Sequence, residues 1–144
     1  MSKIIGIGSD HAGFLLKKDI VLYLKKREYE VRDMGVTEER PVDYPDFAHD
    51  ISRKLQEGII NFGILICGTG IGMSIVANRY KGVRAALCWE VSVAKSARTH
   101  NDANILVLPA RFMKKEIALE CVDIFLREKF EGGRHLSRIE KIEK

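Results

Sequence analysis

The sequence predicts a three-layer α/β/α fold, in which helices cover both faces of one parallel sheet of five strands. Short apolar segments alternate with longer amphipathic segments along nearly all of the 144 residues, which is typical of parallel strands joined by helices. The segment FGILI at residues 62–66 is apolar at every position, as a strand buried on both faces requires. We therefore expect a single Rossmann-like domain over residues 1–144.

The expected elements alternate strictly along the chain. The strands are expected at residues 3–8, 30–34, 62–66, 83–88 and 104–108. The helices are expected at residues 14–27, 46–56, from the turn at 67–72 to about 80, 90–99 and 112–128, with a helical tail after residue 133. In the first helix Leu16, Ile20 and Leu24 share the apolar face. Three of its lysines lie off that face: Lys17, Lys18 and Lys25.

The second helix follows a polar loop that contains Pro41 and Pro45. Asp46 is a plausible N-cap residue for this helix, because its carboxylate accepts hydrogen bonds from free backbone amides. His49 falls among polar residues of the same helix, so we expect it to face solvent.

Composition narrows the class of protein. Hydrophobic residues make up 46% of the chain and charged residues 31%, as in soluble globular proteins, and the net charge is +4. This charge suits an anionic small substrate as well as a nucleic acid. No segment approaches the roughly 20 apolar residues of a membrane span, and the first residues do not form a signal peptide. We expect a cytoplasmic protein without a membrane or nucleic-acid partner.

The three cysteines are widely spaced and form no CxxC motif, so neither a disulfide framework nor a zinc site is predicted. Cys88 and Cys121 fall in apolar segments and are expected in the core. No two histidines have the spacing of metal ligands, and we predict no metal. The glycine-rich segments fit neither GxGxxG nor a P-loop, so no dinucleotide cofactor is predicted.

Polar residues follow the first and third strands, where parallel sheets bind ligands. Asp10 and His11 follow the first strand, either as an acid/base pair or as a helix cap with a packed imidazole. Cys67 opens the turn CGTGIG after the third strand. Inward-pointing amides and the following helix predict a lowered pKa and a reactive thiolate there, the alternative being a buried thiol in a tight turn.

Two further groups lie later in the chain. Arg134 and Arg138 are four residues apart and share a face of a helical tail, which suits a phosphate clamp; the alternative is a solvated charged tail. His100 and Asn101 lie between the fourth helix and the fifth strand, where alone they would be loop and capping residues.

Taken together, several segments resemble the type B ribose-5-phosphate isomerases, a family that includes allose-6-phosphate and galactose-6-phosphate isomerases. The resemblance rests, in chain order, on SDHAGF, VDYPDFA, GILICGTGIGMSIVANR, RAALC, HNDANILVLPAR and GGRHLSRI. It implies cofactor-independent interconversion of ribose 5-phosphate and ribulose 5-phosphate in the pentose phosphate pathway, through a cis-enediolate. Galactose-6-phosphate isomerase subunits often lack the cysteine, which favours the ribose enzyme here.

The resemblance also implies roles for individual residues. Cys67 matches the catalytic base, and Met73 stands where other members carry a glutamate base. His100 matches the residue that helps to open the sugar ring, with Asp10 as its counterpart, and Thr69 matches a hydroxyl near the base. The remaining matches contact the substrate: His11, Tyr44, Gly68, Gly70, Ile71, Gly72, Asn101, Arg111, Arg134 and Arg138.

Topology predicts that these residues cannot meet in one chain. Cys67 and Asp10 follow strands, whereas His100 precedes a strand and Arg134 follows the last long helix, so the two groups lie at opposite ends of the sheet. A strand of this size spans roughly 17–20 Å. We expect a homodimer, or a dimer of dimers, with shared active sites and with residues 130–144 packing on the partner.

Three alternatives stay open. A hexose-6-phosphate isomerase such as an allose-6-phosphate isomerase would use the same chemistry in a longer pocket. A non-catalytic domain that binds a sugar phosphate or nucleotide would not need the thiol of Cys67. A phospho-acceptor receiver domain would need an acidic cluster at the strand ends, but the third strand ends in that cysteine.

Overall fold

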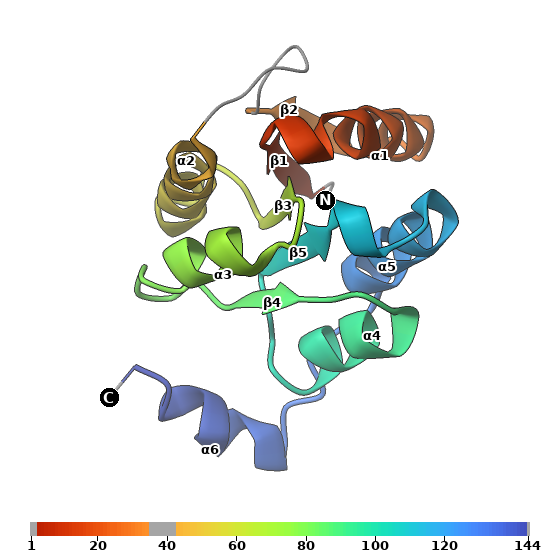
Figure 1. The fold of residues 1–144 in the computed structure, drawn as a ribbon. Coiled ribbons are helices and arrows are strands. Elements are labelled where there is room, and N and C mark those ends of the chain that lie inside the picture. The colour runs from red at the N-terminus through yellow and green to blue at the C-terminus, as the bar shows by residue number, and fades with distance from the viewer. Residues whose placement is uncertain (1–2, 35–42, 144) are drawn as a thin grey trace.

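Five parallel strands form one sheet in the computed structural model, which describes residues 3–34 and 43–143 (Figure 1). In chain order they are β1 (Ile4–Ser9), β2 (Glu30–Asp33), β3 (Phe62–Cys67), β4 (Ala85–Leu87) and β5 (Ile105–Pro109). Across the sheet their order is β2-β1-β3-β5-β4, and every neighbouring pair is parallel. The predicted fold class is confirmed.

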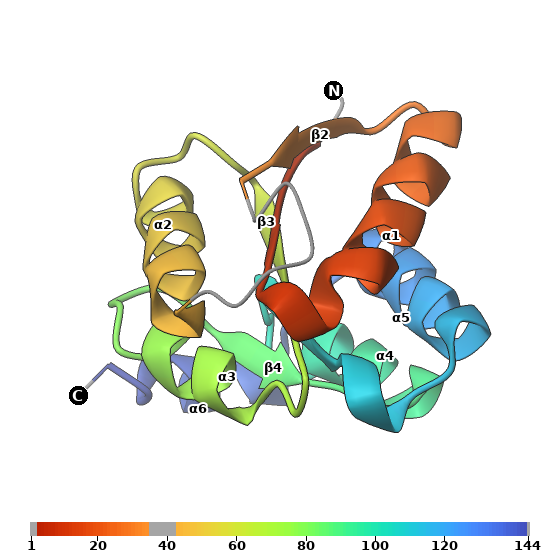
Figure 2. The same cartoon turned by 45° about the horizontal axis from the view of Figure 1, so that its top comes forward.

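The strand order explains where the helices lie. Right-handed crossovers place a helix on one face when the chain moves along the sheet in one direction and on the other face when it moves back. The chain moves one way through α1 (Phe14–Lys26) and α4 (Val91–Thr99), and the other way through α2 (Tyr44–Gln56) and α3 (Ile71–Ala77). Accordingly, α1, α4 and α5 (Lys115–Arg127) cover one face, and α2 and α3 cover the other (Figure 2).

Alternation along the strands builds two cores. Ile64 and Ile66 of β3 join the core under α1, α4 and α5, whereas Leu65 and Cys67 join the core under α2 and α3. Both faces of this strand are thus covered, which confirms the inference from its continuous apolar run. Cys88 and Cys121 are fully buried, as expected.

Lys17 departs from the prediction for the first helix. It is 1% exposed, although the spacing of the apolar residues placed it off the buried face. Its Nζ lies 2.8 Å from Oδ1 of Asp33, at the end of β2. The long aliphatic stem is buried while the charge is paired, so a lysine next to the apolar face can pack inward.

The second helix also begins earlier than predicted. Asp43 is its N-cap and Asp46 lies within its first turn, so the assignment of Asp46 as N-cap is wrong. Pro45 lies in that first turn, where no intrahelical N–H is needed, rather than in the loop. Pro41 lies outside the described residues. His49 is partly buried against the Tyr80 ring and hydroxyl, which corrects its assignment as solvent-facing.

The remaining helices are close to the predicted ranges. A 3₁₀ turn at Ala110–Phe112 and an extended Met113 precede α5, so this helix begins later than expected. The tail forms α6 (Arg134–Glu140), which stands away from the sheet beyond α4 (Figure 1). Within the described ranges, none of the helices has both the length and the apolar character of a membrane span.

Candidate functional site

A pocket of about 450 Å³ lies at the carboxyl ends of the strands. Asp10 and Tyr44 line one part of it and Arg111 another, around the glycine-rich turn after β3. The turn contributes Cys67, Gly68, Thr69, Ile71 and Gly72. Ile75 of α3 completes the lining and was not singled out in the sequence. The structure thus brings together most of the site residues predicted for this end of the sheet.

Close approach explains the glycines of the turn. Gly70 has a φ of 76°, which side-chain-bearing residues rarely adopt, and a Cβ there would lie 2.5 Å from Leu87. A Cβ on Gly72 would lie 2.4 Å from the Tyr44 ring. The backbone amide of Gly70 donates a hydrogen bond to the Cys67 sulfur over 3.0 Å. Glycine at these positions therefore allows the turn that brings the Gly70 amide to the thiol and lets the Tyr44 ring pack against the turn.

Burial of Cys67 reverses the pKa shift predicted for it. Cys67 is 5% exposed. Burial raises the pKa of its thiol above the ordinary value, and the Asp10 carboxylate adds to the rise. Backbone hydrogen bonds from Met73, Gly70 and Thr69 lower the pKa but do not outweigh burial. The prediction of a lowered pKa is therefore wrong for the single chain, in which the protonated thiol is favoured. Burial raises the pKa of the core cysteines much further, to about 12 for Cys88 and to about 11 for Cys121.

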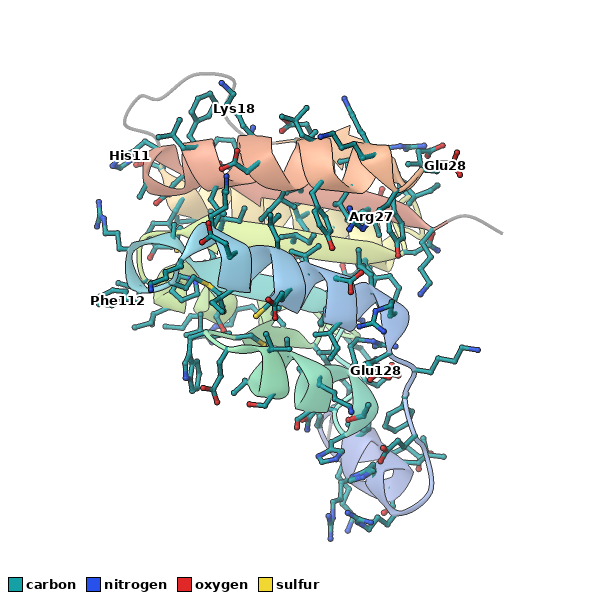
Figure 3. All side chains as sticks on the ribbon, turned by 90° about the vertical axis from the view of Figure 1, so that its right-hand side faces the viewer. His11, Lys18, Arg27, Glu28, Phe112 and Glu128 are labelled. Atoms are coloured by element: carbon teal, nitrogen blue, oxygen red, sulfur yellow. The ribbon has the colours of Figure 1, made fainter. Side chains whose placement is uncertain are left out.

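Asp10 is a cap, the second of the two roles considered for it. Its Oδ1 accepts a hydrogen bond from the Gly13 amide over 3.1 Å, which caps the short 3₁₀ turn, and the residue also lines the pocket. His11 follows Asp10 in the chain and lies at the same end of the molecule as Phe112 (Figure 3). Its Nδ1 is buried and makes no hydrogen bond within the described residues. The nitrogen is thus directed inward without a protein partner there.

A second pocket of about 480 Å³ holds the residues predicted for the opposite end of the sheet. It is lined by His100, Asn101, Arg134, His135, Arg138, Ile139 and Ile142. The two arginines share one face of α6, as their spacing predicted. The pocket therefore offers two guanidinium groups and an imidazole to an anion.

The two pockets are separate within one chain. Cys67 ends β3, whereas His100 ends α4 and precedes β5, so they lie at opposite ends of the sheet. Figure 3 shows the same polarity along α5: Phe112 lies at one end and Glu128, just before the tail, at the other. The structure brings each predicted group together but does not join the two groups.

His135, Ile139 and Ile142 line the second pocket, although sequence reasoning assigned them no role in a site. The His135 ring stacks on that of His100, with centroids 4.5 Å apart and an angle of 15° between the planes. Burial and then the neighbouring Arg134 and His100 lower the pKa of His135. No local pattern links residues so far apart in the sequence, so only the fold reveals this pair.

His100, Glu131 and His135 also have potential metal-ligand atoms within 4.8 Å of one another, which the sequence did not suggest. However, the two imidazole planes are nearly parallel. Their nitrogen lone pairs lie in those planes and run side by side instead of converging, so a shared ion would require one ring to turn.

Comparison with known proteins places these features among sugar-phosphate isomerases. The family model described as Ribose/Galactose Isomerase matches residues 5–142. A putative sugar phosphate isomerase of Rickettsia bellii is 50% identical over 139 residues, which cover 96% of each chain. The ribose-5-phosphate isomerase B of Escherichia coli is 44% identical over 97% of this chain and 94% of its own.

Solved structures agree over the whole fold. A ribose 5-phosphate isomerase from Thermotoga maritima has a TM-score of 0.96 and 51% identity, covering 99% of this chain and 98% of its own. Ribose-5-phosphate isomerase B of Mycoplasma genitalium, solved with bound ribulose-5-phosphate, has a TM-score of 0.95 and 45% identity, covering 99% and 95%.

Proposed function

The chain belongs to the ribose/galactose isomerase family, and from this premise we propose that it interconverts ribose 5-phosphate and ribulose 5-phosphate with Cys67 as the base. That it is an isomerase follows from the family. The proposed substrate is supported by relatives of 44% identity or more that carry this activity in their names, and by the ribulose-5-phosphate bound to one of them. The observation that carries the proposal is the thiol of Cys67. It accepts a hydrogen bond from a backbone amide and lies in a ligand-sized pocket at the end of a central strand.

In the proposed reaction, Cys67 removes the proton from C2 of the open-chain aldose. The electron pair forms the C1–C2 double bond of a cis-enediolate, and its developing charge is placed on O1 next to the amides of residues 68–72. The proton returns to C1, and the O2 hydroxyl proton is lost as the ketone forms at C2 while O1 is protonated. Thr69 lies next to the base, and its hydroxyl accepts a hydrogen bond from the Ile71 amide over 3.2 Å.

The residues around the thiol are proposed to orient the sugar. Asp10, Tyr44 and Arg111 line the pocket, and His11 follows Asp10 in the chain. Among the residues described as lining the pocket, Cys67 carries the only thiol and none is a histidine. The shift of proton between two neighbouring carbons needs only one base, which acts first as acceptor and then as donor.

The second pocket is proposed to complete the site of a partner subunit. His100 would help to open the furanose ring opposite Asp10, Asn101 would contact the sugar, and Arg134 and Arg138 would bind the phosphate. Because the two pockets of one chain lie at opposite ends of the sheet, a twofold axis is the simplest arrangement that joins them. A dimer of dimers would keep the same sites.

The shared site would also offset the rise in the pKa of Cys67. The isolated chain favours the protonated thiol, which is a poor base. Cationic groups lower the pKa of a nearby thiol, and the partner would bring arginines and an imidazole to the pocket mouth. The tail at residues 130–144 would then lie on the partner, where the exposed Leu136 and Ile142 would be covered.

An isomerase assay with ribose 5-phosphate, repeated with allose 6-phosphate, tests the proposal. Turnover of ribose 5-phosphate at a higher kcat/KM than allose 6-phosphate is the expected result. Preference for the hexose would assign the chain to the allose branch of the family, and no turnover of either would leave a sugar-phosphate-binding protein without catalysis.

A further inference from the structure

A buried arginine lies in the last turn of α4, two residues before His100. Arg98 is 7% exposed, and its Nη1 donates to Oδ1 of Asp102 over 3.0 Å and to the carbonyl of Ala103 over 2.6 Å. Its Nε donates to the carbonyl of Glu128, just after α5, over 3.4 Å. A buried guanidinium is costly unless it is paired, and this one is held on three sides.

The guanidinium also packs against the core. Its carbon lies 5.0 Å from the centre of the Phe62 ring and 5.8 Å from that of Phe125. These rings meet edge to face at 5.8 Å. Arg98 is therefore anchored to the rigid interior, and it fixes the positions of the carboxylate and carbonyl groups that it binds.

Asp102 is held from a second direction by Arg84, which precedes β4. The Nη2 of Arg84 lies 3.2 Å from Oδ2 of Asp102, and its Nε donates to the Asp102 carbonyl over 2.9 Å. Asp102 has a φ of 47°, a left-handed conformation that is uncommon for a residue with a side chain. Its carboxylate thus bridges two arginines from different elements. We call Arg98, Asp102 and Arg84 the arginine–aspartate clamp.

The clamp encloses the residues proposed to act on the sugar. His100 and Asn101 are the two turn residues that separate Thr99 from Asp102, and the Thr99 carbonyl accepts a hydrogen bond from the Glu131 amide over 3.0 Å. Together with the bond from Arg98 to residue 128, this ties the segment that leads into α6 to the same turn. The turn with His100 and the segment that leads into α6 are therefore held together by the same set of hydrogen bonds.

We propose that Arg98 and Asp102 are positioning residues for the ring-opening step, and that they hold His100 in register with the phosphate-binding arginines of α6. This inference rests on the proposed function, because it assumes that His100 acts on the sugar ring. It assigns a task to two charged residues that do not line the pocket themselves. Misplacing a reacting group by about 1 Å can cost on the order of 10²-fold in rate.

An aldose that cannot form a ring separates this role from a general one. Ring opening of ribose 5-phosphate moves the proton off O1, forms the C1–O1 double bond, breaks the C1–O4 bond and places a proton on O4. The analogue 4-deoxyribose 5-phosphate has no O4 and carries its phosphate on O5, so it cannot close the five-membered ring and reacts in open-chain form. Loss of ring opening should therefore slow the reaction of ribose 5-phosphate and spare that of the analogue, whereas the two directions of one isomerisation must change together, because the equilibrium constant fixes the ratio of their kcat/KM values.

The experiment measures kcat/KM of Asp102→Asn for ribose 5-phosphate and for 4-deoxyribose 5-phosphate, with His100→Asn as the reference for lost ring opening. For Asp102→Asn we expect a fall of about 10²-fold with ribose 5-phosphate and of less than about threefold with 4-deoxyribose 5-phosphate. Asp123→Asn is the matched control, because it removes another i,i+4 pair with an arginine, Arg127, on the surface of α5. It should change neither kcat/KM value.

Circular dichroism and a melting curve establish that each variant is folded. If Asp102→Asn does not fold, Arg84→Lys decides, because it keeps the positive charge and loosens only one side of the clamp. Equal losses with both substrates, or no loss, in a folded variant would overturn the clamp's role while the proposed function stands. If the parent protein isomerises neither sugar, or if His100→Asn shows no split, the proposed function fails first and takes the clamp's role with it.

Discussion

Mixing of two inactive variants provides a sharp test of the shared site. Cys67→Ala removes the proposed base from the first pocket, and His100→Asn removes the proposed ring-opening group from the second. Each homodimer then carries the same lesion in both sites and should be inactive. Unfolded together and refolded in equal amounts, the chains should form mixed dimers in about half of the population, because pairing is random.

The expected recovery follows from the separation of the pockets. In a mixed dimer, one site receives both lesions, and the other receives intact Cys67 from one chain and intact His100 from its partner. One intact site of two, in about half of the dimers, gives about a quarter of parental activity. The assay is turnover of ribose 5-phosphate after refolding, with differently tagged chains to measure the mixed fraction.

A second pair of variants makes the result specific. In the second pair, Asp10→Asn is mixed with Cys67→Ala. Both substitutions alter the same pocket, so every site of a mixed dimer carries one lesion and no activity should return. Recovery in the first pair but not in the second identifies pockets that belong to different chains. No recovery in the first pair, despite a measured mixed fraction near one half, would refute the shared-site reasoning.

Three further outcomes are expected. Cys67→Ala should lower kcat by at least about 10²-fold with little change in substrate affinity, as measured by steady-state kinetics, because it removes the base and leaves the binding groups; near-normal turnover would show that the base is another group. Arg138→Ala should raise both KM and the inhibition constant of inorganic phosphate by about 30-fold or more, which corresponds to about 2 kcal/mol of binding free energy. An unchanged inhibition constant would show that the tail does not bind the phosphate. Iodoacetamide should label Cys67 faster than Cys88 and Cys121, as mass spectrometry of the labelled peptides would show, because Cys67 lines the pocket whereas burial raises the pKa of the two core thiols to about 12 and about 11; labelling of a core cysteine at the same rate would contradict this assignment of the reactive thiol.

Most of the strands could be predicted because the interior strands carry strong local signals. The run around Ile64 is continuous and apolar, and the structure places β3 within one residue of the prediction. The weaker signal of β4 gave an element that is too long, since only Ala85–Leu87 are paired at this edge of the sheet. Insertion of β5 between β3 and β4 could not be predicted, because pairing between distant strands leaves no local pattern.

The errors at individual side chains have a common cause. The inward turn of Lys17 depends on Asp33, and the contact of His49 depends on Tyr80, both far away in sequence. For Cys67, the local amides were counted correctly, but the burial that raises its pKa comes from tertiary packing. Residue types, spacing and the family resemblance together therefore predicted most of the polar groups that line the two pockets, whereas their protonation depends on neighbours that only the fold supplies.

The position of β5 has a consequence for synthesis on the ribosome. Since β5 lies between β3 and β4, β4 has no strand to pair with until residues 105–109 have left the exit tunnel. Until then β3 presents an open edge of unpaired backbone N–H and C=O groups to the cell. A nascent chain of this topology can assemble β1, β2 and β3 early, but its sheet closes late and in one step, so ribosome-bound chains stalled before β5 should stay sensitive to protease over β4 and become protected together with α4 once β5 emerges.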